Sequence, residues 1–322
     1  MRKIDHSLLQ KAKNNKKDEF YTQLVDIENE LKHYEKHFIG KVVLCNCDDP
    51  RVSNFYKYFV QNFKKLKIKK ITCINYSKND KSGYFYEYDG KNLPYPTARD
   101  LIKMSCNGDF RNHESIQILK KSDIVVTNPP FSLFREYINQ LIEFDKRFLI
   151  IGNINAITYK NVFTFIKENR VWLGINLGRG ISGFIVPSDY ELYGTETKID
   201  KFGNKIISPN NCLWLTNLDN EIRKSEIPLI KKYRGNEISY PFYDNYNGIN
   251  VSKTKDIPMD YFGFMGVPIT FLHKFNPKQF EIIKFRKGDD DKDLSINGKN
   301  PYFRIIIKRL KQNITNASVV NE

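Results

Sequence analysis

Short apolar runs alternate with helical patterns through the first two thirds of the chain. The strand candidates are four apolar runs at residues 41–47, 69–76, 123–128 and 147–153. The helix candidates, with apolar residues at three- and four-residue intervals, are residues 53–66, 113–122, 133–144 and 161–169. The strand runs are apolar throughout, which is typical of strands buried on both faces. This order predicts an α/β fold with a mostly parallel sheet and helices on both of its faces.

Other patterns flank and complete this region. Residues 18–38 carry apolar or aromatic residues at helical intervals, so we expect the first forty residues to form an N-terminal helical segment. The polar stretch 77–98 is rich in Tyr and Gly and predicts a loop or a small hairpin. Further β-rich runs lie at residues 170–176, 183–187 and 211–217.

The composition of the chain changes near residue 225. Prolines, glycines and aromatic residues become frequent there, and strands no longer alternate with helices. Basic clusters recur, among them "KKYR", "KFRKG" and "IIIKRLKQ". We therefore divide the chain into a sheet domain at residues 1–224 and a second, irregular region at residues 225–322.

The charge of the chain indicates a polyanionic partner. The 322 residues include 52 Lys and Arg against 37 Asp and Glu, for a formal net charge of +15. Like charges repel one another in a compact protein unless a polyanion neutralises them, and nucleic acid is the commonest such partner. A membrane surface is the competing partner, but the sequence has neither a signal peptide nor an apolar window long enough to span a bilayer.

Cysteine usage indicates a reducing environment. The five cysteines form no CxxC pair and mostly lie in apolar, strand-like runs; they are Cys45, Cys47, Cys73, Cys106 and Cys212. Buried free thiols are therefore favoured over disulfides or zinc ligands. We predict a cytoplasmic protein without a bound metal.

A rigid corner ends the strand candidate 123–128. Its sequence is Thr-Asn-Pro-Pro-Phe, residues 127–131, and the two prolines fix two φ angles and remove two backbone donors. In open α/β sheets ligands bind beyond the carboxyl ends of the strands, where Asn128 lies. The Asn128 amide and the Pro129 carbonyl could accept both hydrogens of one planar amino group. Phe131 offers a face on which the attached ring could stack.

Such a corner suits the transfer of an alkyl group to an aromatic amine. The nitrogen of this amine is a weak nucleophile because its lone pair is delocalised into the ring. Holding both N–H bonds in a fixed geometry favours a pyramidal nitrogen, so catalysis comes from orientation and aimed dipoles, and no general base is needed before transfer. The alternative is an ordinary turn, since Asn-Pro and Pro-Pro dipeptides are common in loops.

Several segments, in this order, resemble one family, the EcoRI-type adenine-specific DNA methyltransferases. They are "DEFYTQ", "CNCDDPRVSNF", "GDFR", "SDIVVTNPPFSLFREY" and "LGRGISGFIVP", and "SPNNCLWLTNLD" and "GVPITFLHKFNPKQFE" extend the likeness through nearly the whole chain. The resemblance implies a Rossmann-like domain that uses S-adenosylmethionine, followed by a target-recognition region. It also implies a monomer, without an obligate protein partner, that flips an adenine out of double-stranded DNA and methylates its N6, at GAATTC. The methylated site is then protected from the cognate restriction endonuclease.

The resemblance assigns catalysis to the corner. Asn128 and the Pro129 carbonyl would hold the adenine amine. Pro130 belongs to the same rigid motif, and Phe131 would stack on the flipped base.

The resemblance also implies a cofactor site built from three segments. Phe20, Tyr21 and Thr22 match a motif that packs on the methionine part of the cofactor. Gln23 departs from this motif, which usually has a proline there. The segment 1–40 would thus contribute to the cofactor site.

The other two cofactor segments contain acidic residues. Asp109 and Phe110 match a pair whose Asp accepts from the adenine amine of the cofactor, and a helix cap is the alternative for Asp109. Asp48 and Asp49 follow the first strand candidate, and either could face the cofactor. The usual glycine loop is missing after them, as in the family it resembles, and no acidic residue closes the second strand candidate to bind the ribose.

The region 225–322 is the candidate for target recognition. Its basic and aromatic residues could contact phosphates, which position DNA, and base edges, which specify the sequence. Arg179 in "GRG" and Arg286 in "KFRKG" are candidate phosphate contacts. The alternative is that these basic runs form an ordinary solvated surface.

Two other functions compete with DNA methylation. Asn-Pro-Pro-aromatic corners also serve protein-glutamine methyltransferases. A non-catalytic DNA-binding protein or a nuclease of a restriction system is the third candidate, although the sequence shows no PD…(D/E)xK arrangement or HNH cluster. The charge and the extended resemblance favour the site-specific DNA adenine methyltransferase.

Overall fold

A computed structural model describes residues 21–77, 82–186, 197–208 and 211–310. The chain divides into two compact units. The first unit holds the residues up to Val162 together with Val171–Asn220, and the second holds Phe163–Arg170 together with the residues from Glu221 onward. The sequence placed its division four residues later and did not separate the segment Phe163–Arg170 from the sheet domain.

The first unit contains an eight-stranded sheet of mixed direction. Its strands, in spatial order, are β5 (Ile102–Lys103), β4 (Tyr84–Tyr88), β3 (Lys70–Asn75), β2 (Val42–Cys45), β6 (Ile124–Thr127), β7 (Arg147–Asn153), β12 (Cys212–Thr216) and β8 (Trp172–Leu177). The central strands β3, β2, β6 and β7 pair in parallel, so their carboxyl ends meet at one edge. β4 and β12 run antiparallel to their neighbours. The stretch 77–98 therefore contributes a strand to the main sheet.

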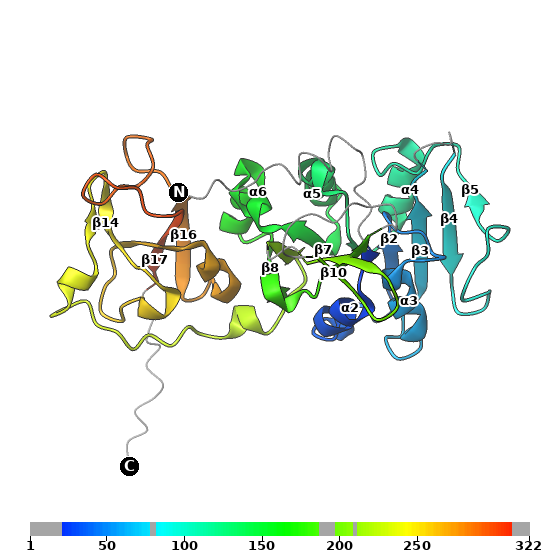
Figure 1. The fold of residues 1–322 in the computed structure, drawn as a ribbon, viewed down its shortest axis with the longest axis horizontal. Coiled ribbons are helices and arrows are strands. Elements are labelled where there is room, and N and C mark those ends of the chain that lie inside the picture. Colours follow the sequence, from blue (N-terminus) through cyan, green and yellow to red (C-terminus); the bar gives the residue numbers. More distant parts are fainter. Residues whose placement is uncertain (1–20, 78–81, 187–196, 209–210, 311–322) are drawn as a thin grey trace, which may run out of the picture. The chain divides into compact units, whose positions relative to one another are not determined.

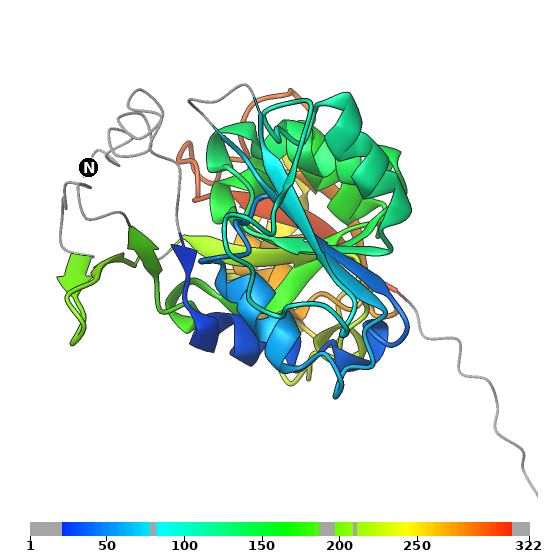
Figure 2. The same cartoon turned by 90° about the vertical axis from the view of Figure 1, so that its right-hand side faces the viewer.

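Helices cover both faces of this sheet. These helices are α2 (Leu24–Leu31), α3 (Asn54–Gln61), α4 (His113–Lys121) and α5 (Phe134–Glu143), whereas α6 (Lys160–Lys167) begins in the first unit and continues into the second. α2 and α3 lie on one face of the sheet, and α4 and α5 lie on the other (Figure 1, Figure 2). Strands covered in this way are buried on both sides, which explains their continuous apolar sequences.

Local sequence explains where two of these helices begin. Ser53 caps α3, as predicted, because its hydroxyl oxygen accepts the N–H groups of Phe55 at 3.1 Å and Tyr56 at 3.2 Å. α2 begins at Leu24, later than predicted, because the preceding residues Tyr21–Thr22 are extended and form the strand β1.

Aromatic side chains from helices and strands fill the core of the first unit. Trp214 of β12 and Phe55 of α3 meet edge to face, with ring centroids 6.0 Å apart. Phe38 and Phe59 pack in the same manner at 5.2 Å. All four rings are at most 2% exposed, so they contribute large apolar areas to the stability of the unit.

A second, four-stranded antiparallel sheet also belongs to the first unit. In spatial order its strands are β1 (Tyr21–Thr22), β9 (Phe184–Val186), β11 (Lys205–Ile207) and β10 (Thr197–Ile199). β1 pairs with β9 so that Thr22 lies opposite Phe184. The pairing fixes the described N-terminal segment against a strand about 160 residues later in the chain.

The second unit contains a five-stranded sheet, so the prediction of an irregular region was wrong. In spatial order the strands are β13 (Phe242–Tyr243), β14 (Tyr246–Asn250), β15 (Phe264–Pro268), β17 (Arg304–Arg309) and β16 (Phe280–Phe285). β14 and β15 pair in parallel, and the other pairs are antiparallel. The residues Ile305–Ile307, which the sequence presented as part of a basic cluster, form the fully buried centre of β17.

The described ranges show no membrane-spanning helix, no metal-binding cluster and no disulfide. No helix in them is long and apolar enough to cross a membrane. No group of three or more His, Cys, Asp or Glu side chains in them could hold a metal ion. The five cysteines are free, and Cys45, Cys73 and Cys212 are buried in strands, as predicted for thiols within apolar runs.

Candidate active site

Polar residues gather where the central strands β2, β3 and β6 end. Asp48 and Asp49 follow β2, Asn75 ends β3, and Asn128 follows β6. The backbone N–H of Asp48 donates to the carbonyl of Ile74 at 3.1 Å, and the Asn75 amide donates to Asp49 Oδ2 at 3.0 Å. The exits of β2 and β3 are therefore bonded to each other at this edge.

The two aspartates after β2 occupy different environments. Asp49 binds the Arg51 guanidinium, with Nη2 and Oδ2 2.5 Å apart, in addition to Asn75. Asp48 accepts hydrogen bonds from the hydroxyls of Ser53 and Thr127. Burial raises the pKa of Asp48 to about 6, against the lowering effect of these two hydroxyls.

A tight loop, Asn107–Asp109, packs against the end of β3. The carbonyl of Asn107 accepts the N–H of Ser77 at 2.8 Å, and Gly108 has a φ of +81°. The Arg111 guanidinium and backbone N–H both donate to Asp109. Burial opposes the ionisation of Asp109, but these bonds outweigh it and hold the pKa of Asp109 below its ordinary value.

The structure excludes the helix-cap alternative for Asp109. The N-cap of α4 is Asn112, and the Asp109 side chain binds Arg111 instead of the first N–H groups of the helix. Phe110 is 4% exposed and packs edge to face on Tyr137, with centroids 5.0 Å apart. The Asp-Phe pair thus combines a carboxylate at the sheet edge with an aromatic ring in the core.

We expect Gly108→Ala to disrupt this loop. A Cβ at Gly108 would overlap the carbonyl oxygen of Asn75, and the positive φ is itself unfavourable for alanine. The substitution should lower the free energy of unfolding by roughly 2–4 kcal/mol, measured by urea denaturation. Gly203→Ala is the matched control, because Gly203 has φ +84° but open space around the added Cβ. Equal losses in the two variants would show that the close approach to Asn75 contributes nothing.

The corner after β6 has the geometry that its prolines impose. Pro130 has φ −56°, and its carbonyl accepts the N–H of Leu133 at 3.0 Å. Pro129 is buried, whereas Asn128 and Phe131 are half-buried. The Phe131 ring packs edge to face on Phe184 of β9, with centroids 6.2 Å apart. The corner is therefore supported by the small antiparallel sheet.

The N-terminal segment reaches the same edge of the main sheet. The carbonyl of Thr22 accepts the Asn54 amide, at the start of α3, at 2.8 Å. The Thr22 hydroxyl oxygen is buried and has no hydrogen-bond partner among the described residues. Tyr21 lies beside Thr22 in β1, half-buried, and Phe20 lies outside the described residues.

Gln23 stands where the cofactor motif of the resembled family usually has a proline, and its backbone conformation suits that position. It is the residue before α2, with φ −69°, a value that proline also adopts. Its amide donates to Ser182 Oγ at 2.7 Å and to the Gly183 carbonyl at 3.0 Å. The departure from the motif thus adds two bonds that attach β1 to the segment before β9.

Two buried carboxylates of α2, which the sequence did not single out, hold β8 and the segment that joins it to β9. Glu30 is fully buried and accepts the N–H groups of Ile175 and Asn176, both at 2.8 Å, and the Tyr34 hydroxyl at 3.0 Å. Asp26 accepts the N–H and the hydroxyl of Ser182. Burial raises the pKa of both carboxyls, against these hydrogen bonds. Their helical spacing of four residues was visible in the sequence, but their partners were not.

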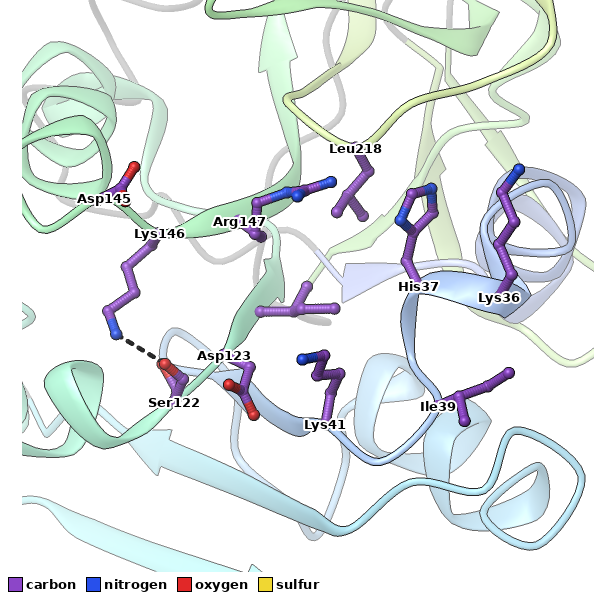
Figure 3. A pocket seen from close by; sticks show the side chains of 11 residues that line it. Lys36, His37, Ile39, Lys41, Ser122, Asp123, Asp145, Lys146, Arg147 and Leu218 are labelled. Carbon is purple, nitrogen blue, oxygen red and sulfur yellow. Dashed lines mark hydrogen bonds between the residues drawn. The ribbon is translucent and has the colours of Figure 1, made fainter.

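A hollow of about 450 Å³ lies at the opposite edge of the main sheet. Its lining comes from the amino ends of strands, including Lys41 before β2, Asp123 before β6 and Arg147 at the start of β7 (Figure 3). Lys146 donates to the Ser122 carbonyl at 2.7 Å on its wall. Asn128 and the aspartates Asp48 and Asp49 follow the carboxyl ends of β6 and β2, so this hollow is a separate feature.

The two candidate phosphate contacts lie in different units. Arg179 belongs to the short turn Gly178–Gly180 that follows β8 in the first unit. In the second unit, the guanidinium of Arg286 pairs with both oxygens of Asp293 and lies over the Phe303 ring, 4.1 Å from its centroid. The Nε and Nη2 groups of Arg286 therefore already donate to a carboxylate of the same chain.

The chain is similar to one family and to relatives of known type over nearly its whole length. Residues 8–310 match the model of the family described as adenine-specific methyltransferase EcoRI. The Type II methyltransferase M.EcoRI of Escherichia coli is 65% identical over 318 residues, which cover 95% of this chain and 98% of that protein. M.MgeORF184P of Mycoplasma genitalium is 38% identical over 320 residues, covering 93% and 98%.

A third relative extends the same pattern. M.MpnI of Mycoplasma pneumoniae, also a Type II methyltransferase, is 37% identical over 322 residues, covering 94% of this chain and 98% of that protein. No solved structure matches the chain. The family match and the full-length relatives agree with the resemblance found in the sequence, and the chain belongs to the EcoRI family of adenine-specific methyltransferases.

Proposed function

We propose that this chain transfers a methyl group from S-adenosylmethionine to N6 of an adenine in double-stranded DNA, at the sequence GAATTC. The observation that carries the proposal is the Asn128-Pro129-Pro130-Phe131 corner, which lies at the end of β6 beside the acidic exit of the neighbouring strand β2. As part of a restriction-modification system, it would protect the DNA of its own cell from a cognate endonuclease. That substrate places the enzyme in the cytoplasm.

The sheet edge fits the proposed cofactor. S-adenosylmethionine carries amino and hydroxyl donors, and the carboxylates of Asp49, after β2, and Asp109, in the loop at the end of β3, can accept from them beside their bonds to Arg51 and Arg111. The buried Thr22 hydroxyl oxygen, which has no partner among the described residues, is a polar group that a ligand could satisfy. When bound, the cofactor supplies an electrophilic methyl group. We assign Tyr21, Thr22, Asp49, Asp109 and Phe110 to its binding, with Asp48 supporting them.

The corner residues orient the acceptor nitrogen. Asn128 Oδ1 and the Pro129 carbonyl would accept the two N–H groups of the adenine amine, while Phe131 contacts the face of the ring. Two acceptors stabilise the positive charge that develops on the nitrogen, and they favour a pyramidal nitrogen with its lone pair free. Because the proton leaves only after the new bond forms, no basic side chain is required at the nitrogen before transfer.

The architecture of the first unit supports the same proposal. β12 runs antiparallel between β7 and β8 at one side of an otherwise largely parallel sheet, as in the Rossmann-like sheets of S-adenosylmethionine-dependent methyltransferases. Ligands of such sheets bind at the carboxyl ends of the strands, the edge that holds Asn128.

The second unit is proposed to recognise the DNA target. Residues 221–310 contain 17 Lys and Arg against 11 Asp and Glu. Large aromatic side chains are exposed on it, including Tyr302 at 69% and Phe242 at 50%. Extruding a base from the duplex requires a few kcal/mol, which phosphate contacts and stacking side chains can offset. We propose that the enzyme acts as a monomer, since it modifies one strand of the duplex per visit.

Transfer of radioactive label tests the proposal against its alternatives. The purified chain is incubated with tritiated S-adenosylmethionine and either a GAATTC duplex, a duplex with one altered base pair, or a mixture of proteins. We expect label in the GAATTC duplex alone. Label in protein would support a protein-glutamine methyltransferase, and no label in any substrate would support a non-catalytic DNA-binding protein.

Binding of the duplex should weaken steeply with salt. Each phosphate neutralised by Lys or Arg releases counterions, so six to ten contacts would reduce affinity by about 10³–10⁵-fold between roughly 50 and 200 mM salt. Fluorescence anisotropy of a labelled GAATTC duplex measures this slope. A salt-independent affinity would exclude extensive phosphate contact by the basic surface.

A further inference from the structure

The carboxylate of Asp48 joins two segments that the proposed reaction needs. Its Oδ1 accepts a hydrogen bond from Ser53 Oγ at 2.7 Å, and its Oδ2 accepts one from Thr127 Oγ1. Ser53 caps α3, and Thr127 is the last residue of β6. Asp48 therefore connects the loop after β2 to the strand that leads directly into Asn128.

This bridge from Ser53 through Asp48 to Thr127 requires a side chain at position 48 that accepts a hydrogen bond at each of its two terminal atoms. The Ser53 hydroxyl oxygen already accepts the N–H groups of Phe55 and Tyr56, so the hydroxyl interacts with Asp48 as a hydrogen-bond donor. Thr127 is fully buried. An ionised carboxylate accepts from both hydroxyls, whereas an acid or an amide presents a donor at one of its two positions.

We propose that Asp48 is a positioning residue for methyl transfer, an inference that rests on the function proposed above. Its carboxylate fixes the end of β6 against the cap of α3 and so holds the Asn128 corner in its working geometry. Asp49 cannot replace it, because Asp49 binds Arg51 and Asn75 on the side of β3. Asp48 acts through Thr127 and does not itself contact the reacting nitrogen.

The surroundings of Asp48 make its charge sensitive to pH. Several acids among the described residues interact electrostatically with it, namely Asp49, Cys45, Cys47, Cys73 and Tyr137. Burial, the largest effect, raises the pKa of Asp48 to about 6. The bridge is therefore complete at pH 8, and protonation removes one of its two acceptors as the pH falls through 6.

Single-turnover rates between pH 5.5 and 8.5 test the proposal, with the full chain, saturating S-adenosylmethionine and a GAATTC duplex. The wild-type rate should fall as the pH drops through 6, to about a quarter of its plateau at pH 5.5, as for one essential deprotonated group. Asp48→Asn should lose this pH dependence and be slower at pH 8 by about ten- to a hundredfold, because the corner is displaced. Its KM for DNA should change little.

Two further variants make the test specific. Thr127→Val keeps the shape of the side chain but removes one donor to Asp48, so the pKa of Asp48 should rise and the acid limb of the rate profile should move to higher pH. Asp145→Asn is the matched control, because Asp145 is exposed at the opposite edge of the sheet. It should retain the wild-type profile.

Thermal unfolding of the chain without cofactor gives a second readout. The pKa of Asp48 is higher in the folded chain than in the unfolded chain, so ionising this carboxyl destabilises the fold. The free energy of unfolding therefore falls as the pH rises from the ordinary pKa of an aspartate to about 6. Asp48→Asn carries no charge, so its Tm at pH 8 should equal or exceed that of the wild-type chain. A merely structural role for the carboxylate predicts a lower Tm instead.

The outcomes are distinct. A slow, pH-independent Asp48→Asn variant with an undiminished Tm supports the positioning role. An Asp48→Asn variant with the wild-type rate at pH 8, or with the wild-type acid limb, overturns it while leaving the proposed function intact. If the wild-type chain itself methylates no DNA at any pH, the proposed function fails and the inference fails with it.

Discussion

Asn128→Ala is expected to reduce the single-turnover rate of methyl transfer by about a thousandfold or more, with little effect on DNA affinity. The substitution removes one of the two acceptors that orient the adenine amine, and single preorganised groups of this kind contribute about 10²–10³ in rate. The loss of orientation between the amine and the methyl donor adds to this effect. Rapid-quench measurements with saturating duplex isolate the chemical step from binding.

Two variants accompany this measurement. Asn139→Ala makes the same change on the exposed side of α5, directly after the corner, and should retain the wild-type rate. Asn128→Asp keeps an acceptor oxygen and should lose less activity than the alanine variant. A fully active Asn128→Ala enzyme would show that the corner is only a turn, the alternative that its dipeptides allow.

Glu30→Ala is expected to cause the largest loss of stability. The carboxylate of Glu30 is fully buried and accepts the N–H groups of Ile175 and Asn176, the Asn176 amide and the Tyr34 hydroxyl. Without it, these donors would be buried and unsatisfied, at a cost of roughly 3–5 kcal/mol in the free energy of unfolding. A decrease of roughly 10 °C in the Tm of the first unit follows, measured by calorimetry.

Glu28→Ala is the matched control for this prediction. Glu28 lies on the same helix, two residues earlier, but its side chain is exposed, so the Tm should change by about 1 °C or less. Equal Tm values for the Glu30 and Glu28 variants would contradict the view that the buried Glu30 carboxylate holds β8 against α2.

The sequence predicted the features that depend on local chemistry. The corner at Asn128 follows β6 as expected, because consecutive prolines leave few conformations and an apolar run of this length forms a buried strand. The Ser53 cap is another example, since a serine before an aromatic-rich helical pattern satisfies its first N–H groups by itself. Such features need no knowledge of the rest of the chain.

Long-range partners could not be predicted in this way. Asp48 and Asp49 are adjacent and chemically identical, and only the positions of Thr127 and Asn75 give them different roles. The sequence likewise could not reveal that Gly108 packs against the end of β3, because Gly108 and Asn75 lie about thirty residues apart in the chain.

The second unit was misjudged for a related reason. Its strands are short, include prolines and glycines, and pair out of sequence order, so no regular spacing marks them. β17 combines three buried isoleucines with flanking basic residues, and because of those basic residues the segment was predicted as a basic cluster and not as a buried strand. Burial of such a strand depends on β15 and β16, which pair with it from both sides.

The most direct measurement is the mass of the nucleosides in a GAATTC duplex after reaction with S-adenosylmethionine that carries a CD3 group. If the Asn128 corner holds an exocyclic adenine nitrogen, digestion will yield trideuterated N6-methyl-2′-deoxyadenosine from one adenine per strand, and Asn128→Ala enzyme will yield almost none. A deuterated cytosine, an unlabelled duplex, or full labelling by the alanine variant would contradict this account.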